Sequence, residues 1–183
     1  MIPAASGRPW PTRQWRRALY GGWTAFVITG IVGGLGFAFH QPWLFPSLGP
    51  TIFIHTMTPH QKAARPWNTF VGHGIGVAAA FVSLGLCGAL HAPSAMIGNH
   101  VTLARIVASM LAVGLTIGGQ IPVRASHAPA TATTLLITLG GFPADLATIG
   151  VIVVGVGIST LLCDWGRRLV TRQCAFQRSP IDK

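Results

Sequence analysis

The sequence has very few charged residues, and acidic residues are the scarcest of all. Only 9% of its 183 residues are charged, three are acidic and none is glutamate, whereas about a quarter of an average globular domain is charged. Half of the residues are hydrophobic. So few charges cannot cover the surface of a water-soluble domain of this size with hydrated groups. The composition therefore predicts an integral membrane protein whose main surroundings are the lipid bilayer.

Cysteines are also few, and they are scattered: Cys87, Cys163 and Cys174. None of them forms a CxxC pair or has the Cys/His spacing of a metal site. We therefore expect no metal and no cofactor. The sequence shows no nucleophile next to a base, so it does not favour an enzyme.

The basic residues are concentrated at the two ends of the chain. Of the thirteen Lys and Arg residues, which give a net charge of +10, nine lie before residue 18 or after residue 166. A nucleic-acid-binding protein would spread such residues along one face, whereas membrane proteins place them beside their spans. We therefore expect no nucleic-acid partner. The pattern divides the chain into a basic cytoplasmic arm (1–17), a transmembrane domain (18–165) and a basic cytoplasmic tail (166–183).

Apolar runs separated by glycine and proline predict six helical segments and an all-α fold. A membrane-spanning helix needs about 20 apolar residues, and four of the segments have that length. The second and fifth are too short, because a helix rises only about 1.5 Å per residue. The segments cover approximately residues 18–39, 47–58, 67–90, 101–121, 128–142 and 144–165.

The order long, short, long occurs twice along the chain. Shifting the sequence by 80 residues aligns Pro42 with Pro122 and Thr51 with Thr131, and it brings the two short segments into register. Because each unit has three segments, the second unit enters the membrane from the opposite side. The pattern predicts a 3+3 inverted-topology repeat with discontinuous second and fifth segments. In transporters, short segments at equivalent positions of two halves indicate the binding site.

The loop charges predict the orientation. With both termini in the cytoplasm, twelve of the thirteen basic residues lie on the cytoplasmic side and only Arg105 does not, as the positive-inside rule requires. We therefore expect a bacterial inner-membrane protein whose loop 92–99 faces outward. Arg105 is expected either to extend to the outer headgroups or to recruit anions. Arg124 is expected to anchor the topology and could also attract anions.

The starts of the two short segments are candidate anion sites. A helix N-terminus presents free backbone N–H groups and a partial positive charge. The stretches SLGPT and SHAPAT add hydroxyl groups there, and no carboxylate lies within the membrane interior to bind a cation. The sequence therefore predicts a small-anion site formed by Ser47, Gly49 and Thr51 at one mouth and His127, Pro129 and Thr131 at the other, with Asn68 and His73 beside them.

Close helix packing is the alternative explanation for small residues in such segments. The pairs Gly30/Gly34 and Gly72/Gly76 have the GxxxG spacing that lets helix backbones approach each other. We interpret both pairs as packing sites. His55 has no assigned role.

Three stretches resemble motifs of the HPP family of integral membrane proteins. They are HAPATATTLL from His127, RPWNTFVGH from Arg65 and SLGPTIF from Ser47, with Ala128 where the family usually has its first proline. The resemblance covers about residues 20–165. Members of the family have been linked to nitrite transport in chloroplasts and cyanobacteria, so the resemblance implies a transporter of a small monovalent anion similar to nitrite or nitrate. The alternative is a membrane scaffold or assembly subunit, and the sequence also allows a homo-oligomer.

Overall fold

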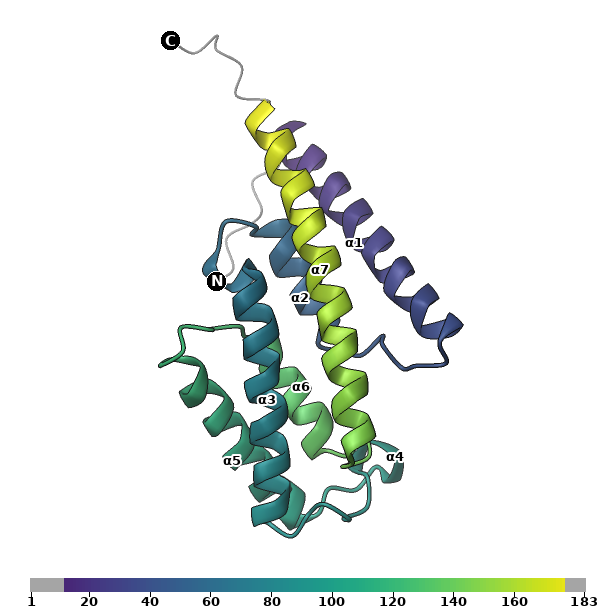
Figure 1. The fold of residues 1–183 in the computed structure, drawn as a ribbon, viewed down its shortest axis with the longest axis vertical. Coiled ribbons are helices and arrows are strands. Elements are labelled where there is room, and N and C mark those ends of the chain that lie inside the picture. The colour runs from purple at the N-terminus through teal and green to yellow at the C-terminus, as the bar shows by residue number, and fades with distance from the viewer. Residues whose placement is uncertain (1–11, 177–183) are drawn as a thin grey trace, which may run out of the picture.

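The computed structural model describes residues 12–176, and within that range the chain consists of helices and loops (Figure 1). The first eleven residues of the basic arm and the last seven of the tail, 177–183, lie outside the described residues. The elements are α1 (Thr12–Ala38), α2 (Leu48–Met57), the 3-10 helix η1 (Lys62–Ala64), α3 (Pro66–Leu86), α4 (Ala95–Gly98), α5 (Leu103–Gln120), α6 (Pro129–Thr138) and α7 (Leu146–Phe176).

Four of these helices are long and apolar enough to cross a membrane. The apolar parts of α1, α3, α5 and α7 that meet this criterion have 18 to 23 residues each. By contrast, α2 and α6 have ten residues each, so each is only about 15 Å long. Each of the six apolar segments predicted from the sequence overlaps one of these six helices, but α1 begins before its segment and α7 continues beyond the end of its segment. The short helices α4 and η1 lie in connections for which no helix was predicted.

The outer surface of the helix bundle is strongly apolar. Large hydrophobic side chains are exposed on all four long helices, including Trp23 and Phe26 on α1, Met110 on α5 and Leu161 on α7. A soluble monomer rarely exposes contiguous apolar areas of this kind. Lipid tails cover such a surface without cost, so the fold is that of an integral membrane protein.

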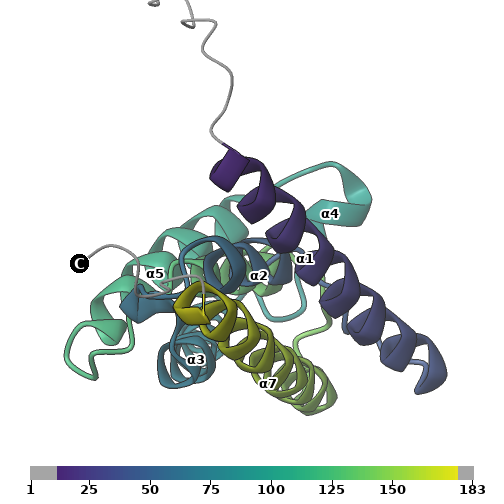
Figure 2. The ribbon, with the colours of Figure 1, turned by 90° about the horizontal axis from the view of Figure 1, so that it is seen from above.

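Helix α3 holds the second half of the chain together. It packs against α5, α6 and α7, whereas α1 packs against α2 and α7. Seen from above, α2 lies near the centre, and α1 and α5 lie on opposite sides of it (Figure 2). Figure 1 shows that α2 and α6 occupy opposite halves of the molecule along its long axis. The starts of the two short helices therefore lie in the middle of the bundle.

The segment between α1 and α2 returns the chain into the protein interior. Trp43 and Phe45 are buried there, and they pack against α7 at Gly155, where a Cβ would lie 2.9 Å from the Trp43 ring. Ser47 follows two residues after Phe45, is fully buried and precedes the first residue of α2. This return segment places the N-terminus of α2 inside the bundle.

Helices α3 and α6 pack closely through two glycines. A Cβ added at Gly72 would lie 2.8 Å from the Cβ of His127, and one added at Gly76 would lie 2.7 Å from the Thr134 hydroxyl oxygen. Gly72 and Gly76 therefore have the packing role predicted for them. At Gly30 and Gly34 a Cβ would meet nothing within 4 Å, so among the described residues this second pair has no such role.

The α3–α6 contact predicts a stability difference between two neighbouring glycines. In Gly76→Ala the new methyl group would lie 2.9 Å from the backbone oxygen of Ala130. Backbone atoms cannot move aside easily, so we expect a loss of about 1–3 kcal/mol in the free energy of unfolding. The control is Gly74→Ala, where the methyl group meets nothing within 4 Å. Thermal unfolding in detergent should show a lower midpoint for Gly76→Ala only, and equal midpoints would contradict the packing.

Candidate functional site

Five polar side chains meet where the first turns of α2 and α6 approach α3. Each side chain is at most 1% exposed to solvent, and each forms hydrogen bonds with other members of the group. We call this group the polar cluster. It consists of Ser47, Thr51, His73, His127 and Thr133.

The first part of the cluster links all three helices. The hydroxyl oxygen of Ser47, at the start of α2, lies 2.7 Å from that of Thr133 on α6. The Thr133 hydroxyl also lies 2.8 Å from Nδ1 of His73 on α3. Thr133 therefore connects the start of α2 to the long helix α3 through hydrogen bonds.

The second part of the cluster joins the two histidines through one threonine. The Thr51 hydroxyl oxygen lies 3.4 Å from Nε2 of His73 and 3.2 Å from Nε2 of His127. The two imidazole rings have their centres 5.1 Å apart. Nδ1 of His127 lies 2.9 Å from the carbonyl oxygen of Ala63 in η1. A carbonyl oxygen can only accept, so this nitrogen of His127 carries a hydrogen.

The contacts also define how the short helices run. Ser47 faces Thr133, and Thr51, one turn later in α2, faces His127, which precedes α6. The pairing order is reversed, so the first turns of α2 and α6 lie side by side and antiparallel. Each helix presents its N-terminal end to the cluster, and both ends carry a partial positive charge.

The loop that positions His127 is held by two amide side chains. Gln120, at the end of α5, accepts a hydrogen bond of 2.8 Å from the His127 backbone N–H, and its amide nitrogen donates to the His127 carbonyl. Asn68 on α3 donates to the carbonyls of Arg124 and Ser126. The predicted residue Asn68 therefore supports the site by fixing this loop. The side chain of Arg124 is exposed.

Four of the eight residues selected from the sequence belong to the cluster: Ser47, Thr51, His73 and His127. Pro129 is buried at the first position of α6. Gly49 is exposed, and Thr131 is half-buried with its hydroxyl donating to the carbonyl of Ala128. Both lie outside the cluster because residues two apart on a helix differ by about 200° in direction.

The residue that α6 contributes to the cluster is Thr133, which is not among the eight residues predicted from the sequence. It lies four residues after Pro129, which puts it on the same side of the helix. The same spacing relates Ser47 and Thr51. A search for polar residues at this spacing after each short-segment start would have found Thr133. Nothing in the local sequence indicated Gln120 or the carbonyl of Ala63.

His55 lies one turn after Thr51 on α2 and is fully buried. Its Nε2 lies 3.0 Å from the hydroxyl of Thr69, while its Nδ1 has no hydrogen-bond partner among the described residues. His55 is therefore a buried histidine close to the cluster but outside its series of hydrogen bonds.

Arg105 fixes the far end of α6. It is 4% exposed, and its guanidinium donates to the carbonyls of Pro93 (2.6 Å), Thr138 (2.5 Å) and Ala92 (2.5 Å). Thr138 is the last residue of α6, where carbonyls lack helical partners and attract a cation. The side chain points into the protein, so the predicted extension to the headgroups is wrong.

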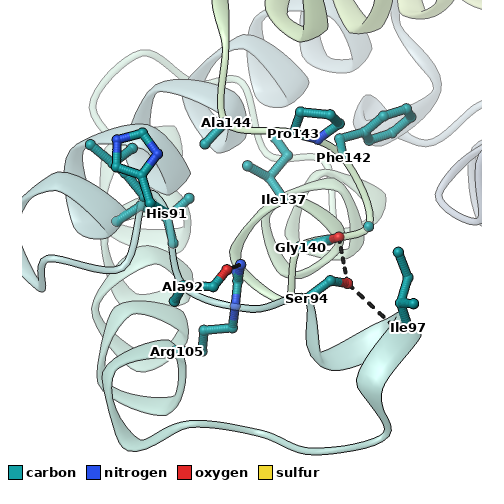
Figure 3. Close-up of a pocket in the computed structure, with 13 residues that line it drawn as sticks. His91, Ala92, Ser94, Ile97, Arg105, Ile137, Gly140, Phe142, Pro143 and Ala144 are labelled. Carbon is teal, nitrogen blue, oxygen red and sulfur yellow. Dashed lines mark hydrogen bonds between the residues drawn. The ribbon is translucent and has the colours of Figure 1, made fainter.

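A cavity of about 290 Å³ lies beside Arg105 (Figure 3). Its lining includes His91, Ser94 and Gly140, and the Ser94 hydroxyl donates to the Gly140 carbonyl at 2.7 Å. Gly140 has a φ of +80°, and a Cβ there would lie 2.8 Å from the Arg105 guanidinium. Only glycine allows the chain to turn here while the arginine reaches the end of α6.

Comparison with known proteins identifies one family. The family model described as "HPP, transmembrane region" matches residues 9–165. This range contains every described helix except the last turns of α7. No curated protein and no solved structure matches the chain.

The arginine contacts generate a stability prediction. Arg105→Met keeps an apolar side chain of similar length but removes all donors to the three carbonyls. Because buried polar groups that lose their partners are costly, we expect the free energy of unfolding to fall by at least about 2 kcal/mol. We also expect faster proteolysis in the 87–102 connection. The exposed Arg124 provides the control, and similar losses in Arg105→Met and Arg124→Met would show that the guanidinium does not hold this end together.

Proposed function

Because the chain belongs to the HPP family of integral membrane proteins, we propose that it transports a small monovalent anion, with nitrite as the first candidate. The observation that supports this proposal is the polar cluster. It gathers hydroxyl and imidazole groups at the N-terminal ends of two short helices inside an apolar bundle. An ionisable group inside a membrane-spanning bundle is by default a candidate for a functional site.

The surroundings of the cluster favour an anion over a cation. Hydroxyl and imidazole groups can donate hydrogen bonds, and two helix N-termini add positive potential at the same place. The two acidic residues in the described range form their hydrogen bonds away from the cluster. Asp145 accepts from the backbone N–H of Thr148, and Asp164 pairs with Arg167 and Arg168. A cation in the cluster would therefore have no carboxylate to neutralise it.

The pair of short helices supports an inverted repeat as the framework of the site. Helices α2 and α6 have the same length, and their first turns are antiparallel. In the proposed topology both termini are cytoplasmic, and each short helix completes a crossing together with the loop before it. Transporters with such repeats bind their substrates at the interface between the halves. The proposed location is the inner membrane of a bacterium.

Substrate access requires movement of the helices around the cluster. All five side chains are at most 1% exposed, and they occupy one another's hydrogen-bonding positions. An incoming anion must therefore replace some of these bonds when the short helices separate. The weakest links by length are the two contacts of Thr51, at 3.2 and 3.4 Å. Opening at Thr51 would expose its hydroxyl on α2 and the Nε2 atoms of His73 on α3 and of His127 in the loop before α6.

Two threonines of α6 provide a matched test of the anion site. Thr133→Val preserves the shape of the side chain but removes the hydroxyl that bridges Ser47 and His73. We expect it to lower nitrite or nitrate flux by about tenfold or more, which corresponds to one lost hydrogen bond to a charged group. Thr131→Val removes a hydroxyl outside the cluster and should retain the parent flux. The measurement is uptake into liposomes containing only the purified protein.

The same assay separates transport from the scaffold alternative. The folded parent protein should move nitrite and nitrate but no alkali cation. Absence of flux for every anion would favour the scaffold, and equal flux in the two valine variants would place the pathway away from the cluster.

The proposed topology has its own test. Single cysteines introduced at Ser94 and at Lys62, in a background without the native cysteines, should react with a membrane-impermeant thiol reagent from opposite sides. We expect labelling of the Ser94 position from outside the cell and of the Lys62 position only after the membrane is opened. Labelling of both positions from one side would contradict the inverted repeat.

A further inference from the structure

The hydrogen bonds of the polar cluster form one continuous series from Ser47 to the carbonyl of Ala63. We infer that this series binds and relays a proton that travels together with the anion. The protein would then be a proton-coupled anion transporter. This inference rests on the proposed function and adds the coupling ion to it.

The hydrogens of the first part can be assigned in one consistent direction. Ser47 donates to Thr133, and Thr133 donates to Nδ1 of His73. His73 then carries its own hydrogen on Nε2 and donates it to Thr51. Each group donates one hydrogen and accepts one, as a neutral hydroxyl or imidazole can.

Thr51 is the branch point of the series. It has one hydroxyl hydrogen but two acceptors, the backbone oxygen of Ser47 at 2.9 Å and Nε2 of His127 at 3.2 Å. If Thr51 donates to His127, the His127 ring is neutral, because its Nδ1 already carries the hydrogen that faces Ala63. If Thr51 donates to Ser47, Nε2 of His127 meets only a lone pair of the hydroxyl. That contact is favourable only when Nε2 is also protonated.

The orientation of one hydroxyl is thus linked to the charge of one histidine. When His127 is neutral, the Thr51 hydroxyl donates to its Nε2. When His127 is charged, the Thr51 hydroxyl donates instead to the backbone carbonyl of Ser47. Both arrangements satisfy every polar atom in this part of the series. The cluster is therefore built with two hydrogen-bonding states that differ by one proton.

The proton balance of one passage is simple. A proton accepted by Ser47 is followed by transfer of the Ser47 proton to Thr133 and of the Thr133 proton to Nδ1 of His73. Nε2 of His73 passes its proton to Thr51, and Thr51 passes its own to Nε2 of His127. Nδ1 of His127 finally releases one proton to water. One proton enters and one leaves, and nothing is oxidised or reduced.

The release end lies beside an exposed loop. Ala63 is half-buried and Ala64 is buried, while Lys62 before them and Arg65 after them are exposed. Nδ1 of His127 therefore lies at the boundary between the buried cluster and this loop. After release, the lone pair on Nδ1 of His127 would face the carbonyl oxygen of Ala63. This contact is repulsive, so it favours a return of the hydrogen bonds to their first arrangement.

No acidic residue in the described range forms a hydrogen bond with the cluster that could hold a proton there permanently. The ionisable groups that interact with His127 are His73 on α3 and His55 on α2, and His55 also interacts with Asp164 and Arg167 of α7. A proton on His127 is then a buried charge facing other bases, which is unfavourable without a partner. An anion in the cluster supplies that partner. A bound proton therefore raises the affinity for the anion, and a bound anion raises the affinity for the proton by the same factor.

The experiment measures proton and anion uptake together in liposomes containing the purified full chain. Nitrate is the first probe, because nitric acid is too strong an acid to carry protons through lipid, and nitrite is the second. Internal pH is followed with a trapped dye, and protein-free liposomes give the background. We expect one proton to enter with each nitrate, without build-up of a membrane potential.

Three variants assign the coupling to the series. In His127→Gln the side chain retains a donor but cannot be charged, and in Thr51→Val the relaying hydroxyl is lost while the shape is kept. In both we expect proton uptake per anion to fall close to the background of protein-free liposomes. His55→Gln is the control, because His55 is equally buried but outside the series, and it should keep the parent ratio. Size-exclusion chromatography in detergent checks that each variant is folded.

The possible outcomes separate the two proposals. Nitrate uptake without protons in the parent protein would overturn proton coupling and leave anion transport standing. Absence of both fluxes would overturn both. If both folded variants, His127→Gln and Thr51→Val, carried protons at the parent ratio, the relay would lie elsewhere and this inference would be wrong.

Discussion

Hydrogen bonding in a low-dielectric interior is the constraint on which this structure depends. The bundle is covered by apolar side chains, so a polar group inside it cannot turn to bulk water and is stabilised mainly by partners within the protein. His127 illustrates the result. Its backbone N–H, its carbonyl and both ring nitrogens all have protein partners, drawn from α5, α2 and η1. One residue thereby ties together segments that are far apart in the chain.

The same constraint explains how α6 can exist as a ten-residue helix. An isolated helix of this length is not stable, and this one is fixed at both ends. At its start, Gln120 and Asn68 hold the preceding loop. At its end, Arg105 donates to the carbonyl of Thr138. Along its length, Gly76 of α3 allows close backbone contact. The polar side chains of α6 are consequently held in fixed positions.

A fully satisfied cluster also has a functional consequence. In the proposed transporter, an anion must replace some of the bonds that hold the closed structure, so substrate binding and helix movement would be coupled by the same groups. Thr51 is the clearest case, since it bonds α2 to itself through Ser47 and also contacts the histidines of α3 and of the α5–α6 loop. A change of charge at His127 would alter these contacts without any change of side-chain position. The proposed joint binding of an anion and a proton depends on these contacts.

Local features of the sequence determined the class of the protein and the approximate extent of its helices. Scarcity of charge and the length of apolar runs act on each segment separately, so the long helices and the short α2 and α6 were predictable without knowledge of their neighbours. The motifs also pointed to Ser47, Thr51, His73 and His127.

Only the tertiary structure decided which side of each short helix faces the cluster. Gly49 and Thr131 lie beside the right residues in the chain but point away, and Thr133 takes the place expected for Thr131. The physical reason is that a helix turns by about 100° per residue, so its facing depends on where it begins and what it packs against. Arg105 was ambiguous for a similar reason, because its three carbonyl partners come together only when the end of α6 meets the loop before α4.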